Sequence, residues 1–165
     1  MMYMKNFKKI IKILTKNHLT IASMESCTGG GVANAITSIE GASEVLKFSA
    51  VTYCNEYKIK MGVKSEVIEK YSVYSIETAH EMALNIAKFA QASFGIGITG
   101  KLNKADINNN FGKDNEVFIS IFYKNKYYDL DMNVDKASRK RNKEEVIKAI
   151  IEKIEEILWE EKLIK

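Results

Sequence analysis

The sequence predicts an α/β fold, namely a three-layer α/β/α sandwich with a mixed, largely parallel sheet. Short apolar segments typical of strands alternate with amphipathic helical patterns through the first half of the chain. A hairpin pattern then precedes one last helical pattern. Neither a linker nor an internal repeat interrupts the 165 residues, so we expect a single domain over residues 1–165.

The spacing of apolar side chains predicts the elements of the first hundred residues. Helical spacing between lysines indicates an amphipathic first helix, short β-branched runs indicate buried strands, and Ser65 and Ser75 are candidate N-caps. The helix after Ser75 has one apolar face, formed by Ala79, Met82, Ala83, Ile86, Ala87 and Ala90. In chain order, we expect a helix over 7–14, a strand over 19–24, a helix over 32–36, a strand over 46–54, a short helix around 56–61, helices from Ser65 through Tyr71 and from Ser75 onward, and a strand over 94–99.

A hairpin and a long helix complete the chain. Residues 117–123 and 127–132 are apolar or alternating on either side of Lys124-Asn125-Lys126, which predicts two antiparallel strands and a tight turn. A polar, Asn-rich loop over 101–115 precedes them. The last helix covers roughly residues 143–163, and its inward face consists of Val146, Ile150, Ile154, Ile157 and Leu158.

The composition narrows the class of protein. The net charge of +4 comes almost wholly from lysine, and only two arginines are present, whereas nucleic-acid readers usually use several. No apolar run approaches the roughly 20 residues of a membrane span. Two cysteines and two isolated histidines form no metal-ligand pattern. We therefore expect a cytoplasmic protein with no nucleic-acid partner, no membrane contact and no metal.

The first motif with chemical potential is Glu25-Ser26-Cys27-Thr28-Gly29-Gly30-Gly31, between a predicted strand and a predicted helix. Open α/β sheets bind ligands at the carboxyl ends of their strands. A helix N-terminus offers free N–H groups and a positive dipole end, which suit phosphate. Glycines allow close approach of a ligand to the backbone. The alternative is a Ser/Thr cap before a glycine turn that binds nothing.

A second polar motif, Tyr53-Cys54-Asn55-Glu56-Tyr57-Lys58, also follows a predicted strand. A helix that begins near Asn55 would put Asn55 and Lys58 on one face, with Tyr53 at the strand end. Tyrosine and lysine beside a serine could activate it as a nucleophile, provided that the surroundings keep the amine neutral. Without further information, a solvated lysine on an amphipathic helix is the favoured interpretation.

Two further features complete the set of candidates. Thr99-Gly100 ends the third predicted strand, at the same sheet edge if the strands are parallel. A basic cluster stands where the last helix begins, which is unfavourable for the helix dipole and slightly favours an anionic partner. The cluster consists of Lys136, Arg139, Lys140, Arg141 and Lys143. A solvated run of charges is the simpler alternative.

Four motifs occur in an order and spacing that resemble one family. They are residues 25–30, Tyr53-x-Asn55-x-x-Lys58 followed by Met61-Gly62-Val63, Ser75-x-Glu77-x-Ala79-x-x-Met82-Ala83, and Gly97-Ile98-Thr99-Gly100, with Gly41-Ala42-Ser43 between the first two. Over about residues 5 to 160, the chain resembles the nicotinamide-nucleotide amidases, the CinA C-terminal domain, in its stand-alone form.

The resemblance implies an amidohydrolase that converts nicotinamide mononucleotide to the acid and ammonia. Ser26 would attack the amide carbon, Lys58 and Tyr53 would activate the serine and transfer protons, and Thr99 would support the site. The family implies no metal or other cofactor and a homodimer. The residues implied to contact substrate are Glu25, Cys27, Thr28, Gly29, Gly30, Asn55, Gly100, and Arg139 or Arg141 near the phosphate.

The loop after the third strand departs from the common family pattern. Many members continue with Gly-Ile-Ala-Gly-Pro, whereas this chain has Gly100-Lys101-Leu102. The loop resembles a variant branch on the basis of Asp106, Asn108, Asn109, Glu116 and Val117. Two alternatives therefore stay open: a nucleotide-binding accessory or sensor protein without turnover, and an enzyme whose nucleophile is Cys27, since a helix N-terminus can lower a thiol pKa.

Overall fold

The computed structural model describes residues 2–103, 112–135 and 138–165, and a five-stranded sheet of order β2-β1-β3-β4-β5 forms its centre. Strand β1 is parallel to β2 and β3, whereas β4 is antiparallel to both β3 and β5. The predicted mixed sheet is confirmed. The strands are β1 (Ile21–Glu25), β2 (Leu46–Val51), β3 (Phe94–Gly100), β4 (Glu116–Tyr123) and β5 (Lys126–Asn133).

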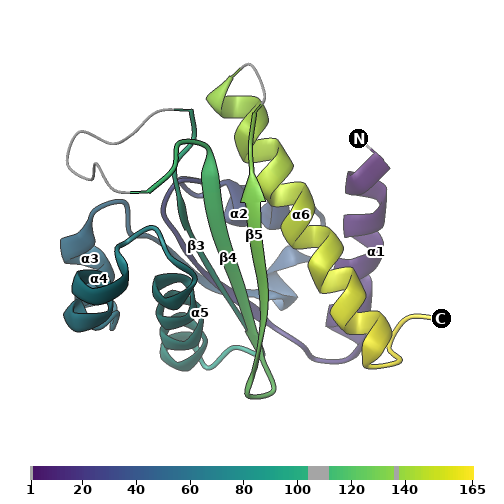
Figure 1. Ribbon diagram of the computed structural model, residues 1–165. Coiled ribbons are helices and arrows are strands. Elements are labelled where there is room, and N and C mark those ends of the chain that lie inside the picture. Colours follow the sequence, from purple (N-terminus) through teal and green to yellow (C-terminus); the bar gives the residue numbers. More distant parts are fainter. Residues whose placement is uncertain (1, 104–111, 136–137) are drawn as a thin grey trace.

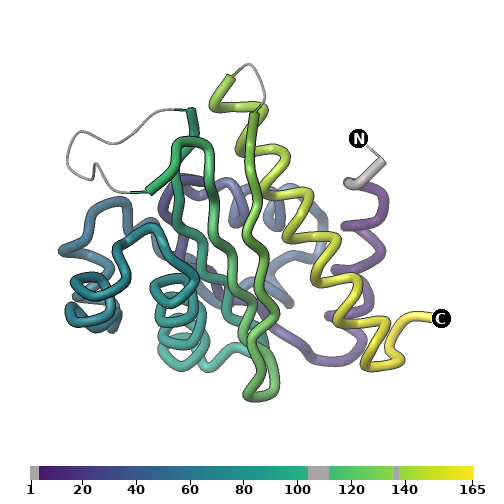
Figure 2. Tube along the Cα trace, in the orientation of Figure 1, coloured from purple at the N-terminus to yellow at the C-terminus, as the bar shows by residue number. Residues whose placement is uncertain are grey.

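Helices cover both faces of the sheet (Figures 1 and 2). Helices α1, α2 and α6 pack on one face, and α5 packs on the other with α4 beside it. This arrangement is the three-layer sandwich that the sequence predicts. The helical elements are α1 (Met2–Lys16), α2 (Gly31–Thr37), the 3₁₀ turn η1 (Ala42–Glu44), α3 (Asn55–Lys60), α4 (Ser65–Tyr71), α5 (Ile76–Ala90) and α6 (Arg139–Glu160).

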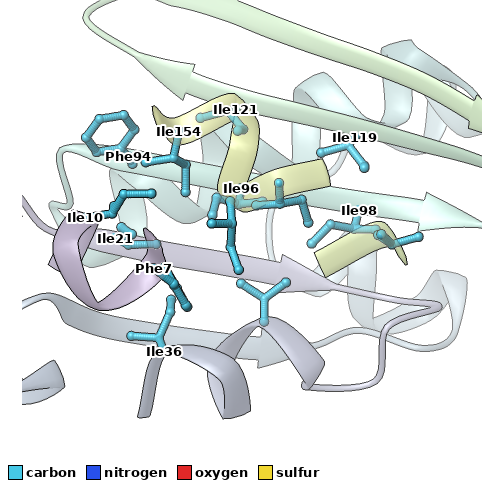
Figure 3. Close-up of a cluster of buried hydrophobic side chains, with 14 of the residues drawn as sticks. Phe7, Ile10, Ile21, Ile36, Phe94, Ile96, Ile98, Ile119, Ile121 and Ile154 are labelled. Atoms are coloured by element: carbon cyan, nitrogen blue, oxygen red, sulfur yellow. The ribbon is translucent and has the colours of Figure 1, made fainter. Parts of the chain in front are cut away.

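The larger part of the core lies between the sheet and the α1/α6 layer. Figure 3 shows Phe7 of α1 and Ile154 of α6 packed with isoleucines of the central strands, including Ile21 and Ile96. Each of these side chains is at most 2% exposed. Complete burial of one such side chain contributes about 1.5–3 kcal/mol. These contacts fix the central strands against α1 and α6, and thereby also position the residues at the strand ends.

Helix α5 lies unusually close to β3, because β3 has glycines where the helix crosses it. A Cβ atom at Gly97 would lie 2.3 Å from the backbone oxygen of Ala79, and one at Gly95 would lie 2.0 Å from that of Ala83. The inward face of α5 is as predicted: Ala79, Met82, Ala83, Ile86 and Ala87 are buried, and Ala90 is half-buried. Small residues on both elements thus set the spacing between them.

The N-caps of α5 and α4 and the turn between β4 and β5 can be compared with the predicted caps and hairpin. Ser75 is the N-cap of α5, as predicted, and its Oγ accepts a hydrogen bond from the Thr78 N–H at 3.1 Å. The prediction for Ser65 is wrong, because Lys64 is the N-cap of α4 and Ser65 is its first helical residue. The hairpin turn has positive φ at Lys124 and Asn125, which is typical of a type I′ turn.

Several elements have other bounds than predicted, and hydrogen bonds explain two of the differences. The second strand ends at Val51 instead of residue 54, because the Thr52 N–H still bonds to the Glu25 carbonyl but the Thr52 carbonyl turns to the Lys58 side chain. Helix α6 begins at Arg139 instead of residue 143, because Ser138 caps it through a hydrogen bond from the Arg141 N–H. Asp106, Asn108, Asn109 and Lys136 lie outside the described residues.

Candidate active site

The predicted motifs meet at one edge of the sheet. Because β1, β2 and β3 are parallel, their carboxyl ends lie on the same side, where α6 also begins (Figure 1). Ser26 directly follows β1, Thr52 directly follows β2, and Thr99 and Gly100 are the last two residues of β3. This is the edge at which open α/β sheets bind ligands.

A buried serine–lysine pair stands at the centre of this edge. The Lys58 Nζ donates hydrogen bonds to the Ser26 Oγ at 3.0 Å and to the Thr52 carbonyl at 2.7 Å. Lys58 is 1% exposed and Ser26 is 8% exposed. The interpretation of Lys58 as a solvated lysine is therefore wrong. Burial also disfavours the charged form of an amine, and lysine can act as a base only in its neutral form.

Helix α3 aims Lys58 at the serine. The helix begins at Asn55, one residue before the expected range of 56–61 and shortly after the end of β2, and it is only six residues long. Asn55 is half-buried in its first turn and Lys58 is buried, so the face that they share points into the protein. The side chains of Glu56 and Tyr57 are exposed. The short helix thus directs the Lys58 side chain into the protein, while the side chains of Glu56 and Tyr57 face solvent.

Cys27 lies beside Ser26 but has the wrong electrostatic surroundings for a nucleophile. The side chain is buried, and burial raises the pKa of the Cys27 thiol to about 12. The attraction of Lys58 and Arg139 for a thiolate opposes this shift but is smaller. Since the thiolate is the reactive form, a neutral thiol at physiological pH is a poor nucleophile. The idea that the helix N-terminus activates Cys27 does not fit this geometry.

Glu25 caps helix α2 from inside the protein. Its buried carboxylate accepts hydrogen bonds from the N–H groups of Val32 at 2.9 Å and Ala33 at 3.1 Å, and from the Thr28 Oγ1 at 2.7 Å. The expectation that the start of α2 offers free N–H groups to a phosphate is therefore wrong for Val32 and Ala33. Glu25 and Thr28 bind each other and shape the turn around Ser26.

The structure distinguishes between the two arginines. The guanidinium of Arg139 reaches across the sheet edge and donates hydrogen bonds to the Leu102 carbonyl and, at 3.4 Å, to the Tyr53 Oη. Arg141 is exposed, and its backbone N–H binds the capping Ser138. Arg139 is thus the arginine beside the site. Tyr53, which was expected to activate Ser26 together with Lys58, is 61% exposed, and its hydroxyl accepts a hydrogen bond from Arg139.

The end of β3 closes the site from the opposite side. Thr99 is buried, and its Oγ1 donates to the Val73 carbonyl at 2.8 Å, which ties β3 to the segment before α5. A Cβ atom at Gly100 would lie 2.6 Å from the Glu116 carbonyl oxygen, so no side chain fits between β3 and β4 there. Both residues are where the sequence places them, and both fix the backbone at the strand end.

Two further lysines lie at this edge: Lys143, which the sequence offered only as part of the basic cluster, and Lys101, which was not predicted as a site residue. A Cβ atom at Gly29 would lie 3.3 Å from the Lys143 Nζ, so this lysine of the first turns of α6 lies against the glycine turn. Gly29 and Gly30 have φ of +58° and +92°, which explains why the turn needs glycine there. Lys101, directly after β3, is buried. Its place after a strand end was the signal in the sequence.

Comparison with known proteins identifies the family. Residues 4–158 match the sequence model of the CinA C-terminal domain. The chain belongs to this family. A CinA-like protein of Flavobacterium psychrophilum is 43% identical over 113 residues, which are 67% of this chain and 26% of that protein. A CinA-like protein of Kosmotoga olearia is 46% identical over 92 residues, 55% of this chain and 22% of that protein. The matched part thus spans about a quarter of these relatives.

Solved structures of CinA proteins share the fold. A CinA superfamily protein from Klebsiella pneumoniae has a TM-score of 0.87 at 18% identity, with 96% of this chain and 98% of that chain covered. The competence/damage inducible protein CihA from Agrobacterium tumefaciens has a TM-score of 0.82 at 25% identity, with 91% and 92% covered. The α/β sandwich of the CinA family is therefore the fold of this chain.

No group of three or more His, Cys, Asp or Glu within residues 2–103, 112–135 and 138–165 could hold a metal ion. In the same part of the chain, no helix is long and apolar enough to span a membrane.

Proposed function

We propose that this protein is an amidohydrolase that converts nicotinamide mononucleotide to nicotinate mononucleotide and ammonia, with Ser26 as the nucleophile. The observation that carries the proposal is the 3.0 Å contact between the buried Lys58 Nζ and the Ser26 Oγ. A serine hydroxyl is a weak nucleophile until a base accepts its proton. An amine held within hydrogen-bond distance is such a base when it is neutral.

The reaction would proceed in two steps. In the first, Lys58 takes the proton of Ser26 while the Oγ forms a bond to the carboxamide carbon. The C–N bond then breaks, Lys58 returns the proton to the departing nitrogen, and ammonia leaves an acyl ester on Ser26. In the second, a water molecule gives a proton to Lys58 and attacks the ester, and Ser26 regains its hydroxyl as the acid departs. The Thr52 carbonyl, 2.7 Å from the Nζ, holds the amine in place throughout.

The surrounding residues support this chemistry by holding the backbone. Glu25 and Thr28 fix the turn that carries Ser26, and the Ser26 N–H is bonded to the Ile98 carbonyl of β3 at 3.1 Å. Backbone N–H groups of the turn at Cys27, Thr28 and Gly30 would face the oxyanion or the nucleotide, whereas the Gly29 N–H is bonded to the Ser26 carbonyl at 2.9 Å and closes the turn. Such preorganised donors are the usual means of stabilising the tetrahedral intermediate of acyl transfer.

Other residues would orient the nucleotide. Arg139 would bind the phosphate from the start of α6, and Tyr53, to which it is bonded, would lie along the substrate. Asn55 and Gly100 would border the pyridine end, and Thr99 would hold the floor of the site through its bond to Val73. A planar guanidinium is well suited to phosphate because it presents paired donors.

An ammonia-release assay tests the proposal. Nicotinamide mononucleotide, its riboside and a simple aromatic amide are each incubated with the protein, and ammonia is measured over time. The proposed function predicts release from the nucleotide well above release from the other two. Tight binding of the nucleotide without ammonia release would contradict the enzyme and support an accessory or sensor role of the same fold.

A further inference from the structure

Lys101 is a second buried lysine at the same sheet edge. It directly follows β3, and its N–H donates to the Glu116 carbonyl at 2.9 Å, which fixes its backbone against β4. The residue is 3% exposed, comparable to the 1% of Lys58. Lysine is among the residues least often buried without a partner. Its position therefore calls for an explanation.

The Lys101 ammonium group has few polar partners among the described residues, although the residue is buried. Its Nζ lies 3.5 Å from the Gly112 carbonyl oxygen, at the outer limit of a hydrogen bond, and 4.8 Å from the centroid of the Tyr74 ring. No carboxylate of the described residues lies within 4.0 Å of it. A protonated lysine has three donors. Among the residues that the structure describes, one long hydrogen bond and one aromatic ring leave donors of this group available to an anion.

The neighbours of Lys101 belong to the candidate site. Thr99 and Lys101 contact consecutive residues before α5, namely Val73 and Tyr74. The Arg139 guanidinium donates to the carbonyl of Leu102, the residue after Lys101. Two cationic residues thus stand at adjacent positions after the end of β3: Lys101 itself, and Arg139 through its hydrogen bond to the Leu102 carbonyl. A phosphate monoester, which carries up to two negative charges, matches this pair better than a carboxylate does.

We propose that Lys101 binds the phosphate group of the nucleotide on which Ser26 and Lys58 act. This inference rests on the proposed function for the identity of the ligand. Tyr74 stabilises the ammonium through its ring without neutralising it, so the charge remains for the phosphate. Arg139 approaches from α6 and Lys101 from the end of β3.

The binding of inorganic phosphate tests the role of Lys101 without any turnover. Phosphate is titrated by calorimetry into the wild-type protein, Lys101→Met and the control Lys88→Met, which removes an exposed lysine of α5. We expect Lys101→Met to weaken phosphate binding about 10- to 150-fold, the range for a hydrogen bond to a charged group, and Lys88→Met to leave it unchanged. Without phosphate, Lys101→Met should melt at or above the wild-type temperature, because it removes a buried charge that has no counter-ion among the described residues.

A second titration identifies the phosphate as that of the nucleotide. In a Ser26→Ala background, Lys101→Met should weaken binding of nicotinamide mononucleotide by a similar factor and leave the riboside unaffected. Unchanged phosphate affinity, or no phosphate binding by the wild type, would overturn the proposal. A lower melting temperature with unchanged nucleotide affinity would show that Lys101 is structural. If Lys101→Met does not fold, the same titrations are made with Lys101→Gln. Ammonia release by the wild type is scored separately, so a failure of the proposed function is distinguishable from a failure of this inference.

Discussion

The buried Cys27 thiol makes a quantitative prediction about stability at alkaline pH. Burial raises its pKa from 9.0 to about 12 in the folded protein. As pH rises above 9, the unfolded chain loses the thiol proton while the folded protein keeps it, so folding becomes less favourable. The stability that the neutral thiol provides is complete below pH 9 and is lost progressively up to about pH 12. At pH 10, the loss is about 1.4 kcal/mol of unfolding free energy for these two pKa values.

The assay compares two variants that differ at one thiol. Urea unfolding is measured from pH 8 to pH 10 for Cys54→Ala and for Cys54→Ala/Cys27→Ala, so that the exposed Cys54 contributes to neither. The second variant is less stable at pH 8 because it lacks a buried side chain. The difference between the two should then shrink by about 1.4 kcal/mol at pH 10. A constant difference would refute the claim that Cys27 is held neutral, and with it the main physical argument against Cys27 as nucleophile.

Three other predictions concern the base, the sheet–helix contact and the phosphate. Lys58→Arg should lower the rate of ammonia release by at least about 100-fold, because a guanidinium stays protonated and cannot accept the serine proton; a near-normal rate would show that only charge is needed. Gly97→Ala should lower the unfolding free energy by about 1–3 kcal/mol, since its Cβ would lie 2.3 Å from a backbone oxygen of α5. The control Gly31→Ala meets only the end of a flexible side chain and should change the unfolding free energy little. Equal effects of the two variants in urea unfolding would contradict this reasoning. Arg139→Ala in an inactive serine-to-alanine background should weaken nucleotide binding about 10- to 150-fold by calorimetry, with little change for the riboside or for Arg141→Ala; equal losses for both ligands would place the arginine elsewhere.

The fold was largely predictable because its signals are local. The apolar spacing of α5 and its cap Ser75 define that helix without reference to the rest of the chain. The hairpin turn at Lys124-Asn125 follows from the two patterns on either side of it. Helix α6, in contrast, begins four residues earlier than its apolar pattern indicates, because its first turn is basic and exposed and is defined by the cap Ser138.

The site was predictable as a set of motifs but not as a set of contacts. Parallel strands bring Ser26 and Lys58 to one edge, and the motif order indicates that much. The burial of Lys58 depends on the turn of the Thr52 carbonyl, which no local pattern records. Likewise, the capping of α2 by Glu25 requires a strand residue to reach groups seven and eight positions later. For Lys101, the sequence shows only its place after a strand end, whereas its contacts with Tyr74 and Gly112 come from segments distant in the chain.

The nucleophile is the central claim, and the rate of ammonia release from nicotinamide mononucleotide in two single variants tests it most directly. Ser26→Ala should release no ammonia above background while its circular dichroism spectrum matches that of the wild type. Cys27→Ala, one residue away and also buried, should retain most of the activity. An active Ser26→Ala protein together with an inactive, folded Cys27→Ala protein would contradict the assignment and make the cysteine the attacking residue.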